Sequence, residues 1–297
     1  MCELMAMSFA APISADFSIR AFAPSDDENP DGWGLAWYPD QSLALVKEPR
    51  KWRESRHAGF LEANPHLSSR IYLAHVREKS RGGPPTHADT HPFGRELMGR
   101  EYAFAHNGTL ADPVYDLPLG PAHPLGQTDS EHAFCHLLRE LAARGRHLDA
   151  EDDWRWLHAS LARLNRLGTL NVLLADGRRL FCYHDAAGWK GLCFRPLRFS
   201  DRQARHFGDV DLTFDLEADA VNRGVVVASR PLGRGAWPSF RLGELLVLQD
   251  GAVCFSSHRD RLAAEFAPAA AGAARAARDR DRVPQAPEDD RFPMADA

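Results

Sequence analysis

The chain has 297 residues, 44% of them hydrophobic, which is enough for one large domain with a sizeable core or for two small domains. Its formal net charge of −5 lacks the basic excess of nucleic-acid-binding proteins, so we expect no nucleic-acid partner. No stretch approaches the ~20 apolar residues of a membrane span, and the first residues lack the basic region of a signal peptide, so we expect no membrane partner.

The cysteines argue against two further classes of protein. The chain has five, scattered and without a C-x-x-C pair, which disfavours both a zinc site and a disulfide framework. Reduced thiols are typical of the cytoplasm, and we therefore predict a cytoplasmic protein.

Apolar runs separated by turn residues predict mostly strands in the first third of the chain. The strands are expected at residues 2–9, 32–38, 43–46 and 71–76, with one helix over 52–67. A long loop rich in Gly, Pro, Thr and His runs from Ser80 to Pro92. Residues 102–105 form another predicted strand, which we expect to end at a turn made by Asn107 and Gly108.

The remainder of the chain combines two helices with further strands. Residues 111–127 are rich in proline and are not expected to form regular structure. The clearest helical pattern covers 129–144, where Thr128 or Asp129 can cap the first turn, and a second helix is predicted over about 151–165. Further strands are expected at residues 170–175, 179–184, 225–229, 245–248 and 252–256. Strands on both sides of a helix pair predict a layered α+β architecture.

The second residue, Cys2, carries the most specific chemical signal. Initiator methionine is commonly removed when a small residue follows it, and loss of Met1 would leave Cys2 with a free α-amine beside its thiol. Such an amine titrates near pH ~8 and can act as a base, while the thiolate is the reactive form of cysteine. The alternative is that Cys2 is an accident of the start site, buried in a first strand.

Four short motifs follow Cys2 along the chain. They are Asp31-Gly32-Trp33-Gly34, Ala74-His75-Val76-Arg77 leading to Ser80-Arg81-Gly82-Gly83, His106-Asn107-Gly108-Thr109, and Thr128-Asp129-Ser130-Glu131. In this order and at these spacings, the set resembles the class II glutamine amidotransferases over roughly residues 2–257. The resemblance implies the αββα four-layer sandwich of N-terminal-nucleophile hydrolases in one domain over 2–266. Residues 267–297 are rich in Ala, Arg, Asp and Pro with few large apolar residues, so we predict a disordered tail there.

The same resemblance implies the catalytic residues. Cys2 would attack the γ-carbonyl of glutamine, while the Asn107 amide and the Gly108 backbone N–H would stabilise the oxyanion. A γ-glutamyl thioester would form on Cys2, and neither a metal nor a cofactor would take part. An Asn-Gly pair is otherwise most often a plain hairpin turn, and that alternative stays open.

The resemblance also implies the residues that bind the substrate. Arg77, at the end of a predicted strand, would bind the α-carboxylate, with the Ser80 hydroxyl nearby. Asp129 would hold the α-ammonium. Without the neighbouring motifs, Arg77 would be interpreted as a surface ion-pair residue and Asp129 as a helix N-cap. Gly32 and Gly34 are expected to let backbone approach the Cys2 terminus.

The histidines suggest a metal site only weakly. His132 and His136 are four residues apart on a predicted helix, but the order is not H-E-x-x-H, so we expect satisfied or surface histidines. For His75, His87, His91 and His106 we expect structural hydrogen bonds.

The sequence thus predicts a stand-alone enzyme that releases ammonia from glutamine and leaves open three alternatives. The chain could cleave another γ-glutamyl amide, it could be a non-catalytic regulator that binds glutamine, or it could deliver ammonia to a separate synthase subunit. Retention of Met1 would favour the regulator, because the base would be blocked.

Overall fold

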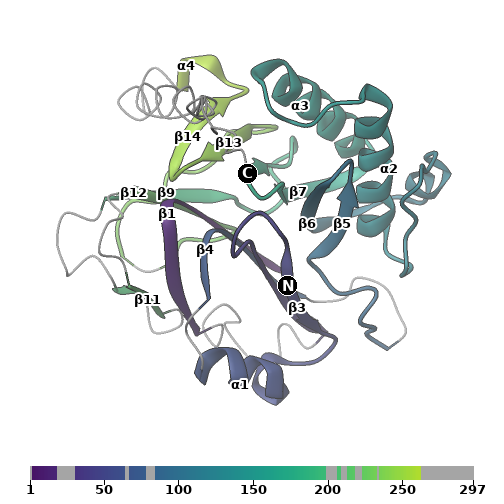
Figure 1. The fold of residues 1–297 in the computed structure, drawn as a ribbon. Coiled ribbons are helices and arrows are strands. Elements are labelled where there is room, and N and C mark those ends of the chain that lie inside the picture. The colour runs from purple at the N-terminus through teal and green to yellow at the C-terminus, as the bar shows by residue number, and fades with distance from the viewer. Residues whose placement is uncertain are drawn as a thin grey trace, which may run out of the picture.

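Two antiparallel sheets lie face to face, with helices on their outer sides (Figure 1). This computed structural model describes residues 2–18, 31–63, 67–77, 84–198, 206–208, 213–217, 223–232 and 234–261. The expected disordered tail over 267–297 lies outside these residues. Within them, no helix is long and apolar enough to cross a membrane.

The first sheet has eight strands and contains the start of the chain. In the order β10-β11-β1-β4-β2-β3, with β12 and then β9 also joined to β1, its strands are β10 (His206–Gly208), β11 (Thr213–Glu217), β1 (Glu3–Ser18), β4 (Ser68–Arg77), β2 (Gly32–Trp37), β3 (Ala44–Glu48), β12 (Arg223–Ala228) and β9 (Cys193–Arg198). The short helix α1 (Arg56–Ala63), preceded by the 3-10 turn Trp52–Glu54, packs on its outer face.

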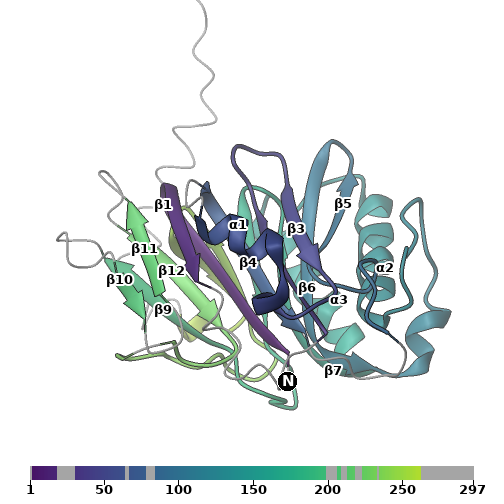
Figure 2. The same cartoon turned by 90° about the horizontal axis from the view of Figure 1, so that it is seen from below.

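The second sheet has six strands and carries the two long helices. In spatial order its strands are β14 (Ala252–Ser256), β13 (Leu245–Gln249), β8 (Arg179–Tyr183), β7 (Gly168–Ala175), β6 (Arg100–Leu110) and β5 (Phe93–Leu97). Helices α2 (Asp129–Arg144) and α3 (Glu151–Asn165) cover its outer face. Figure 2 shows α2 and α3 on the far side of β5 and β6 from β3 and β4, which is the order of layers in an αββα sandwich.

Alternation along β1 shows how the sequence builds the layers. Leu4 and Ala6 belong to the apolar cluster between the sheets, whereas Met5 and Met7 belong to the cluster beneath α1. Successive side chains of a strand point to opposite faces, so a strand buried on both faces reads as a continuous apolar run. All four of these side chains are at most 1% exposed.

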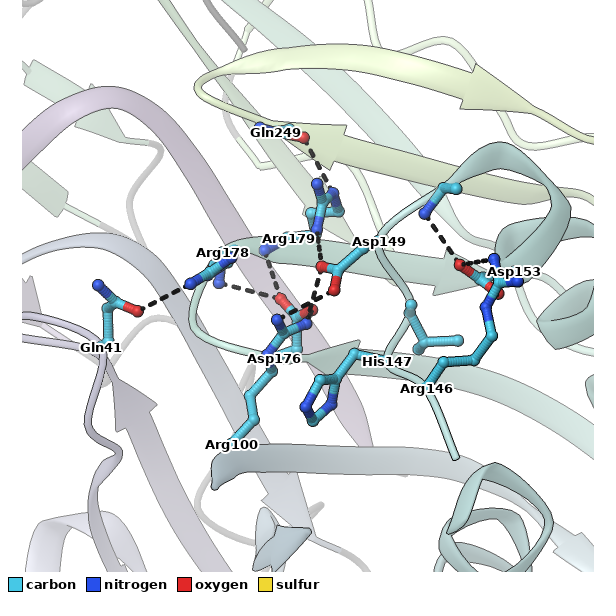
Figure 3. A network of polar contacts seen from close by, with 12 residues as sticks. Gln41, Arg100, Arg146, His147, Asp149, Asp153, Asp176, Arg178, Arg179 and Gln249 are labelled. Carbon is cyan, nitrogen blue, oxygen red and sulfur yellow. Dashed lines mark hydrogen bonds and ion pairs between the residues drawn. The ribbon is translucent and has the colours of Figure 1, made fainter. Parts of the chain in front are cut away.

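A network of arginines and aspartates lies at one end of the second sheet, where β6 begins and β7 turns into β8 (Figure 3). Arg100 at the start of β6 donates to both Asp149 and the buried Asp176, each at 3.0 Å. Arg179 donates to Asp149 at 2.8 Å, so one carboxylate on the loop between α2 and α3 receives both guanidinium groups. These contacts join that loop to the β7–β8 turn and to the start of β6.

The structure confirms many predicted elements and corrects others: the helix expected over 52–67 is limited, among the described residues, to α1 and the 3-10 turn before it, and a 3-10 helix, Asp112–Asp116, lies in the segment expected to lack regular structure. Helix α2 spans the predicted range and is capped by Thr128, whose hydroxyl accepts a hydrogen bond from the Glu131 N–H at 3.1 Å. The predicted turn at Asn107 and Gly108 is wrong, because both residues lie inside β6, paired with Asn171 and Leu170 of β7. Strand β6 continues to Leu110, and the turn at Met98-Gly99, where both residues have positive φ, lies before it and joins β5 to β6.

Candidate active site

The layer between the two sheets becomes polar at the end opposite the Arg–Asp network. Its apolar positions include Leu4, Leu73 and Ala105. Side chains two residues apart on a strand face the same side, so Cys2, His75 and Asn107 face this layer too. Arg77, two residues after His75 on β4, is next on the same face. The strand ends therefore place a thiol, an imidazole, an amide and a guanidinium in one layer.

Cys2 lies directly before β1, is half-buried and carries a reduced thiol. Its main-chain carbonyl accepts a hydrogen bond from Asn107 Nδ2 at 2.8 Å and one from Lys190 Nζ at 3.4 Å. Asn107 itself is 2% exposed. A carboxamide nitrogen carries two hydrogens, so Asn107 keeps one N–H for a further acceptor next to Cys2.

Gly108 follows Asn107 in β6, at a position that no other residue could fill. A Cβ there would lie 2.1 Å from the Thr169 carbonyl oxygen and 2.5 Å from a ring nitrogen of His106, and its φ is +155°. Two residues later, the Leu110 N–H points out of the β6–β7 ladder and donates to Asp129 at 2.6 Å. Because backbone N–H groups alternate in direction along a strand, the Gly108 N–H also points away from β7. Gly108 lies beyond Phe104, the last β6 residue that is paired with β5.

Arg77 ends β4 beside Gly32 of β2. Its side chain is 6% exposed, and within the described part of the chain its Nη1 has no hydrogen-bond partner. The interpretation of Arg77 as a surface ion-pair residue is therefore wrong. A buried guanidinium nitrogen without an acceptor is costly, and a planar fork of this kind suits a carboxylate.

Asp129 begins α2 but does not cap it, because Thr128 has that role. Its Oδ2 accepts the Leu110 N–H at 2.6 Å, which fixes the carboxylate against the end of β6. Its Oδ1 is 3.5 Å from the Ser130 hydroxyl, and the residue is half-buried. An anion is thus held at the end of the strand that carries Asn107 and Gly108. Ser80, expected near the substrate carboxylate, lies outside the described residues.

His75 and His91 form a buried pair beside Arg77. Their ring centroids are 4.4 Å apart, and none of their four ring nitrogens has a hydrogen-bond partner among the residues that the structure describes. Burial, with Arg77 and His106 nearby, lowers the pKa of His75 to about 3, and burial also lowers the pKa of His91 well below its usual value. The structural hydrogen bonds expected for His91 are therefore not found among the described residues, whereas for His75 the backbone of His106 lies close enough to offset part of the fall in pKa. His106 does make them, to Ser130 Oγ at 2.8 Å and the Thr169 carbonyl at 3.1 Å.

The glycines of β2 make room for the segment that carries His91. A Cβ on Gly34 would lie 2.2 Å from the His91 carbonyl oxygen, and one on Gly32 would lie 3.1 Å from the Thr90 side chain. Because β4 separates β2 from β1, these glycines do not face the Cys2 backbone, and the expectation that they do is wrong. Lys47 Nζ holds the same segment by donating to the Thr90 carbonyl at 2.7 Å.

Sequence patterns gave no signal for Lys190, which lies in the loop between β8 and β9. Single lysines in loops are common, and only the fold brings this one to Cys2. Helix α2 supplies no metal site: His132 and His136 bond the carbonyls of Leu117 and Pro118 at 3.0 and 2.8 Å. No cluster of three or more His, Cys, Asp or Glu that could hold a metal occurs in the described ranges.

The arrangement thus combines a thiol, a buried amide donor beside it, a fixed carboxylate and a buried cation, one nitrogen of which has no hydrogen-bond partner in the described part of the chain. Such a set can bind an amino-acid head group and offer a nucleophile to the far end of its side chain.

Comparison with known proteins identifies similar chains. Residues 1–270 match the family described as class II glutamine amidotransferases. The chain is 31% identical over 257 residues to the Escherichia coli protein named "Putative glutamine amidotransferase YafJ", covering 82% of this chain and 96% of that one. It is also 35% identical over 261 residues to an uncharacterized protein of Methanocaldococcus jannaschii, covering 87% and 72% of the two chains.

Solved structures and a more distant relative extend the comparison. A crystal structure described as a predicted glutamine amidotransferase from Pseudomonas aeruginosa superposes with a TM-score of 0.66 at 28% identity, covering 85% of this chain and 99% of that one. The phosphoribosylpyrophosphate amidotransferase of Bacillus subtilis shares the fold, with a TM-score of 0.56 at 16% identity over 86% and 48% of the chains. A γ-glutamyl-hercynylcysteine sulfoxide hydrolase of Mycolicibacterium smegmatis is 30% identical over 173 residues, covering 54% of this chain and 66% of that one.

Proposed function

This chain belongs to the class II glutamine amidotransferases, and from that premise we propose that it hydrolyses the γ-amide of glutamine through a γ-glutamyl thioester on Cys2. Removal of Met1 would make Cys2 the first residue. Its α-amine would then serve as the base that takes the thiol proton.

In the proposed first step, the Cys2 sulfur attacks the γ-carbonyl carbon and a C–S bond forms. The carbonyl π electrons move to oxygen, where the second N–H of the Asn107 amide and the Gly108 N–H stabilise the negative charge. Collapse of this intermediate breaks the C–N bond. The proton held by the α-amine passes to the departing nitrogen, which leaves as ammonia.

In the second step, water attacks the thioester. The α-amine accepts a proton from the water, the C–S bond breaks, and glutamate and the free thiol are released. Throughout both steps, Arg77 would hold the α-carboxylate and Asp129 the α-ammonium, so that the γ-carbon reaches Cys2 in one orientation.

The observation that supports this proposal most strongly is the 2.8 Å hydrogen bond from the Asn107 amide to the Cys2 carbonyl. It places a buried amide donor at the nucleophile from a strand 105 residues away in sequence. The test is an ammonia-release assay on glutamine with the wild type and Cys2→Ala. Release by the wild type alone supports the proposal, and equal release by Cys2→Ala contradicts it.

A second candidate is hydrolysis of another γ-glutamyl amide, with the same glutamyl site and a different leaving group. The similarity to a hydrolase named for a γ-glutamyl compound favours this candidate. A panel of γ-glutamyl amides assayed beside glutamine distinguishes the two. A kcat/KM at least 100-fold higher for one panel member than for glutamine would establish the second candidate.

A further inference from the structure

The ammonium group of Lys190 lies next to the backbone of Cys2, 3.4 Å from its carbonyl oxygen. The same oxygen accepts the Asn107 amide at 2.8 Å. The carbonyl of Cys2 is therefore held from two sides, by a strand of the second sheet and by the loop between β8 and β9.

That loop is fixed from within by the buried carboxylate of Asp185, which is 0% exposed. One carboxylate oxygen accepts the N–H groups of Ala187 and Trp189 at 2.9 and 3.0 Å. The other accepts the Leu170 N–H at 2.8 Å and the Asn165 amide at 2.7 Å. Four donors on one buried carboxylate leave the loop little freedom to move.

Asn171 joins this loop to the strand that faces Cys2. Its amide donates to the Trp189 carbonyl at 2.9 Å, and its oxygen accepts the Asp185 N–H at 3.0 Å. Asn171 is also the register partner of Asn107 across the β6–β7 pair. Neighbouring amides on the two strands thus hold Cys2 and the loop that carries Lys190.

The backbone of Lys190 is itself in an unfavourable conformation. Its φ is +50°, in the left-handed region that residues with a side chain rarely adopt. Its carbonyl is bonded to His184 Nε2 at 3.1 Å, which holds the residue in this state. Such conformations persist where surrounding contacts over-determine them, and they cluster at functional sites.

We propose that Lys190 is a positioning residue of the reaction: it holds the Cys2 carbonyl and keeps a positive charge beside the thiol and the α-amine. The inference rests on the proposed function of Cys2. A cation here favours the thiolate over the thiol, and it favours the neutral over the protonated α-amine. Both effects raise the fraction of enzyme that is ready to attack.

Other charged groups near Cys2 determine how far its titration shifts when Lys190 is lost. Glu3, next along β1, lies within reach of the charges of Arg230 and Lys190, and burial raises the pKa of its carboxyl. From β4, Arg77 adds a second cation, whereas His75 stays neutral because its pKa lies at about 3. With Glu3 opposing the two cations, we expect loss of Lys190 to shift the titration of Cys2 by about 0.5 to 1 pH unit.

The test measures the reactivity of Cys2 without any glutamyl substrate. Wild type, Lys190→Met and Lys190→Arg, each checked for the same amino-terminal residue by intact mass, are alkylated with iodoacetamide between pH 5.5 and 9. Burial raises the pKa of Cys135 to about 11 and those of Cys193 and Cys254 to about 12, so these thiols stay protonated in this range. The buried Cys182 is shifted in the same direction. Cys2→Ala serves as the blank.

We expect the midpoint of Cys2 alkylation to rise by about 0.5 to 1 pH unit in Lys190→Met and to stay within 0.2 unit of the wild type in Lys190→Arg. An unshifted midpoint in Lys190→Met would overturn the inference, because a neutral tether would then suffice. Ammonia release is measured separately. If the wild type hydrolyses no γ-glutamyl amide, the proposed function fails, while the alkylation midpoints still decide the role of Lys190.

Discussion

The Asn107 side-chain amide donates to the main-chain carbonyl of Cys2 at 2.8 Å, and thereby joins the second sheet to the start of the first. Asn107 and Gly108 lie inside β6 and therefore do not form the turn that an Asn-Gly pair usually makes. The contact and the unusual φ of Gly108 are consistent with a role for this pair in the chemistry.

Asn107→Asp is the sharpest variant of that pair, because it keeps the size of the side chain and replaces both amide N–H groups by an acceptor. We expect kcat for ammonia release to fall about 10²–10³-fold, the usual cost of losing an oxyanion donor. KM should change less than threefold. Unchanged kcat would show that neither N–H of the Asn107 amide, including the one donated to the Cys2 carbonyl, contributes to catalysis.

Arg77 is tested by pairing a variant with a modified substrate. Arg77→Met should lower kcat/KM for glutamine about 30- to 100-fold, since a charge-assisted bond in a buried site is worth about 2–3 kcal/mol. With 4-aminobutanamide, which lacks the α-carboxylate, wild type and Arg77→Met should be equal within threefold. A full loss on both substrates would mean that Arg77 supports the fold and not the carboxylate.

Asp129→Asn separates the charge of this residue from its structural bond. The Asn oxygen can still accept the Leu110 N–H, so the helix should remain docked, but the attraction for an ammonium is lost. We expect KM for glutamine to rise at least tenfold, with no change in KM for 4-carboxybutanamide, which lacks the α-amine. Equal effects on the two substrates would contradict a role in ammonium binding.

The buried histidine pair predicts how stability depends on pH. The ordinary pKa of histidine is about 6.5, and in the fold both His75 and His91 stay neutral well below that value. Below pH 6.5 the unfolded chain therefore binds protons that the folded chain does not, so the free energy of unfolding falls as the pH falls. Each histidine contributes up to about 1.4 kcal/mol per pH unit.

Urea unfolding of wild type and His91→Gln at pH 7.5, 6.5, 5.8 and 5.0 measures this slope. Below pH 6.5, the variant should lose stability less steeply than the wild type, by up to the contribution of one histidine. Parallel curves would show that His91 takes up its proton in the folded state as readily as in the unfolded chain.

At the opposite end of the sandwich, we predict that a variant of the Arg–Asp network loses stability but keeps its catalytic activity. Arg100 is 12% exposed and pairs with Asp176, which is 0% exposed. Removing one partner of a buried pair leaves an uncompensated charge, so Arg100→Met should lower the free energy of unfolding by about 2–4 kcal/mol. The exposed Arg178→Met is the matched control, with less than about 0.5 kcal/mol expected. A kcat reduced more than twofold in folded Arg100→Met would contradict the separation of the two ends.

The elements that local patterns define were predictable from the sequence. Helix α2 has an apolar face and a threonine cap, and the β7–β8 hairpin turns at Asp176-Gly177; each signal lies within a few residues. The family, the fold class and the positions of Cys2, Arg77 and Asp129 at element ends followed from motif order. The predicted strand over 102–105 ends before β6 does, because an Asn-Gly pair normally forms a turn. Only the pairing of Asn107 and Gly108 with β7 overrides that preference.

What the sequence could not supply depends on contacts between distant segments. Lys190 reaches Cys2 across 188 positions, and nothing local marks it. The fit of Gly34 against the His91 carbonyl and the stacking of His75 on His91 likewise exist only once β2 and β4 are adjacent to the 84–92 segment. Strand β9 was missed because Cys193–Arg198 contains Pro196 and two arginines, a poor strand pattern that pairing with β12 stabilises.

The central claim, acylation of Cys2 at the start of the mature chain, is tested most directly by mass spectrometry of the amino-terminal peptide after acid quench during turnover with glutamine. The account predicts a peptide that begins at Cys2, with a fraction carrying one glutamyl group that hydroxylamine removes. A peptide that retains Met1 and carries no adduct while ammonia is being released would contradict it.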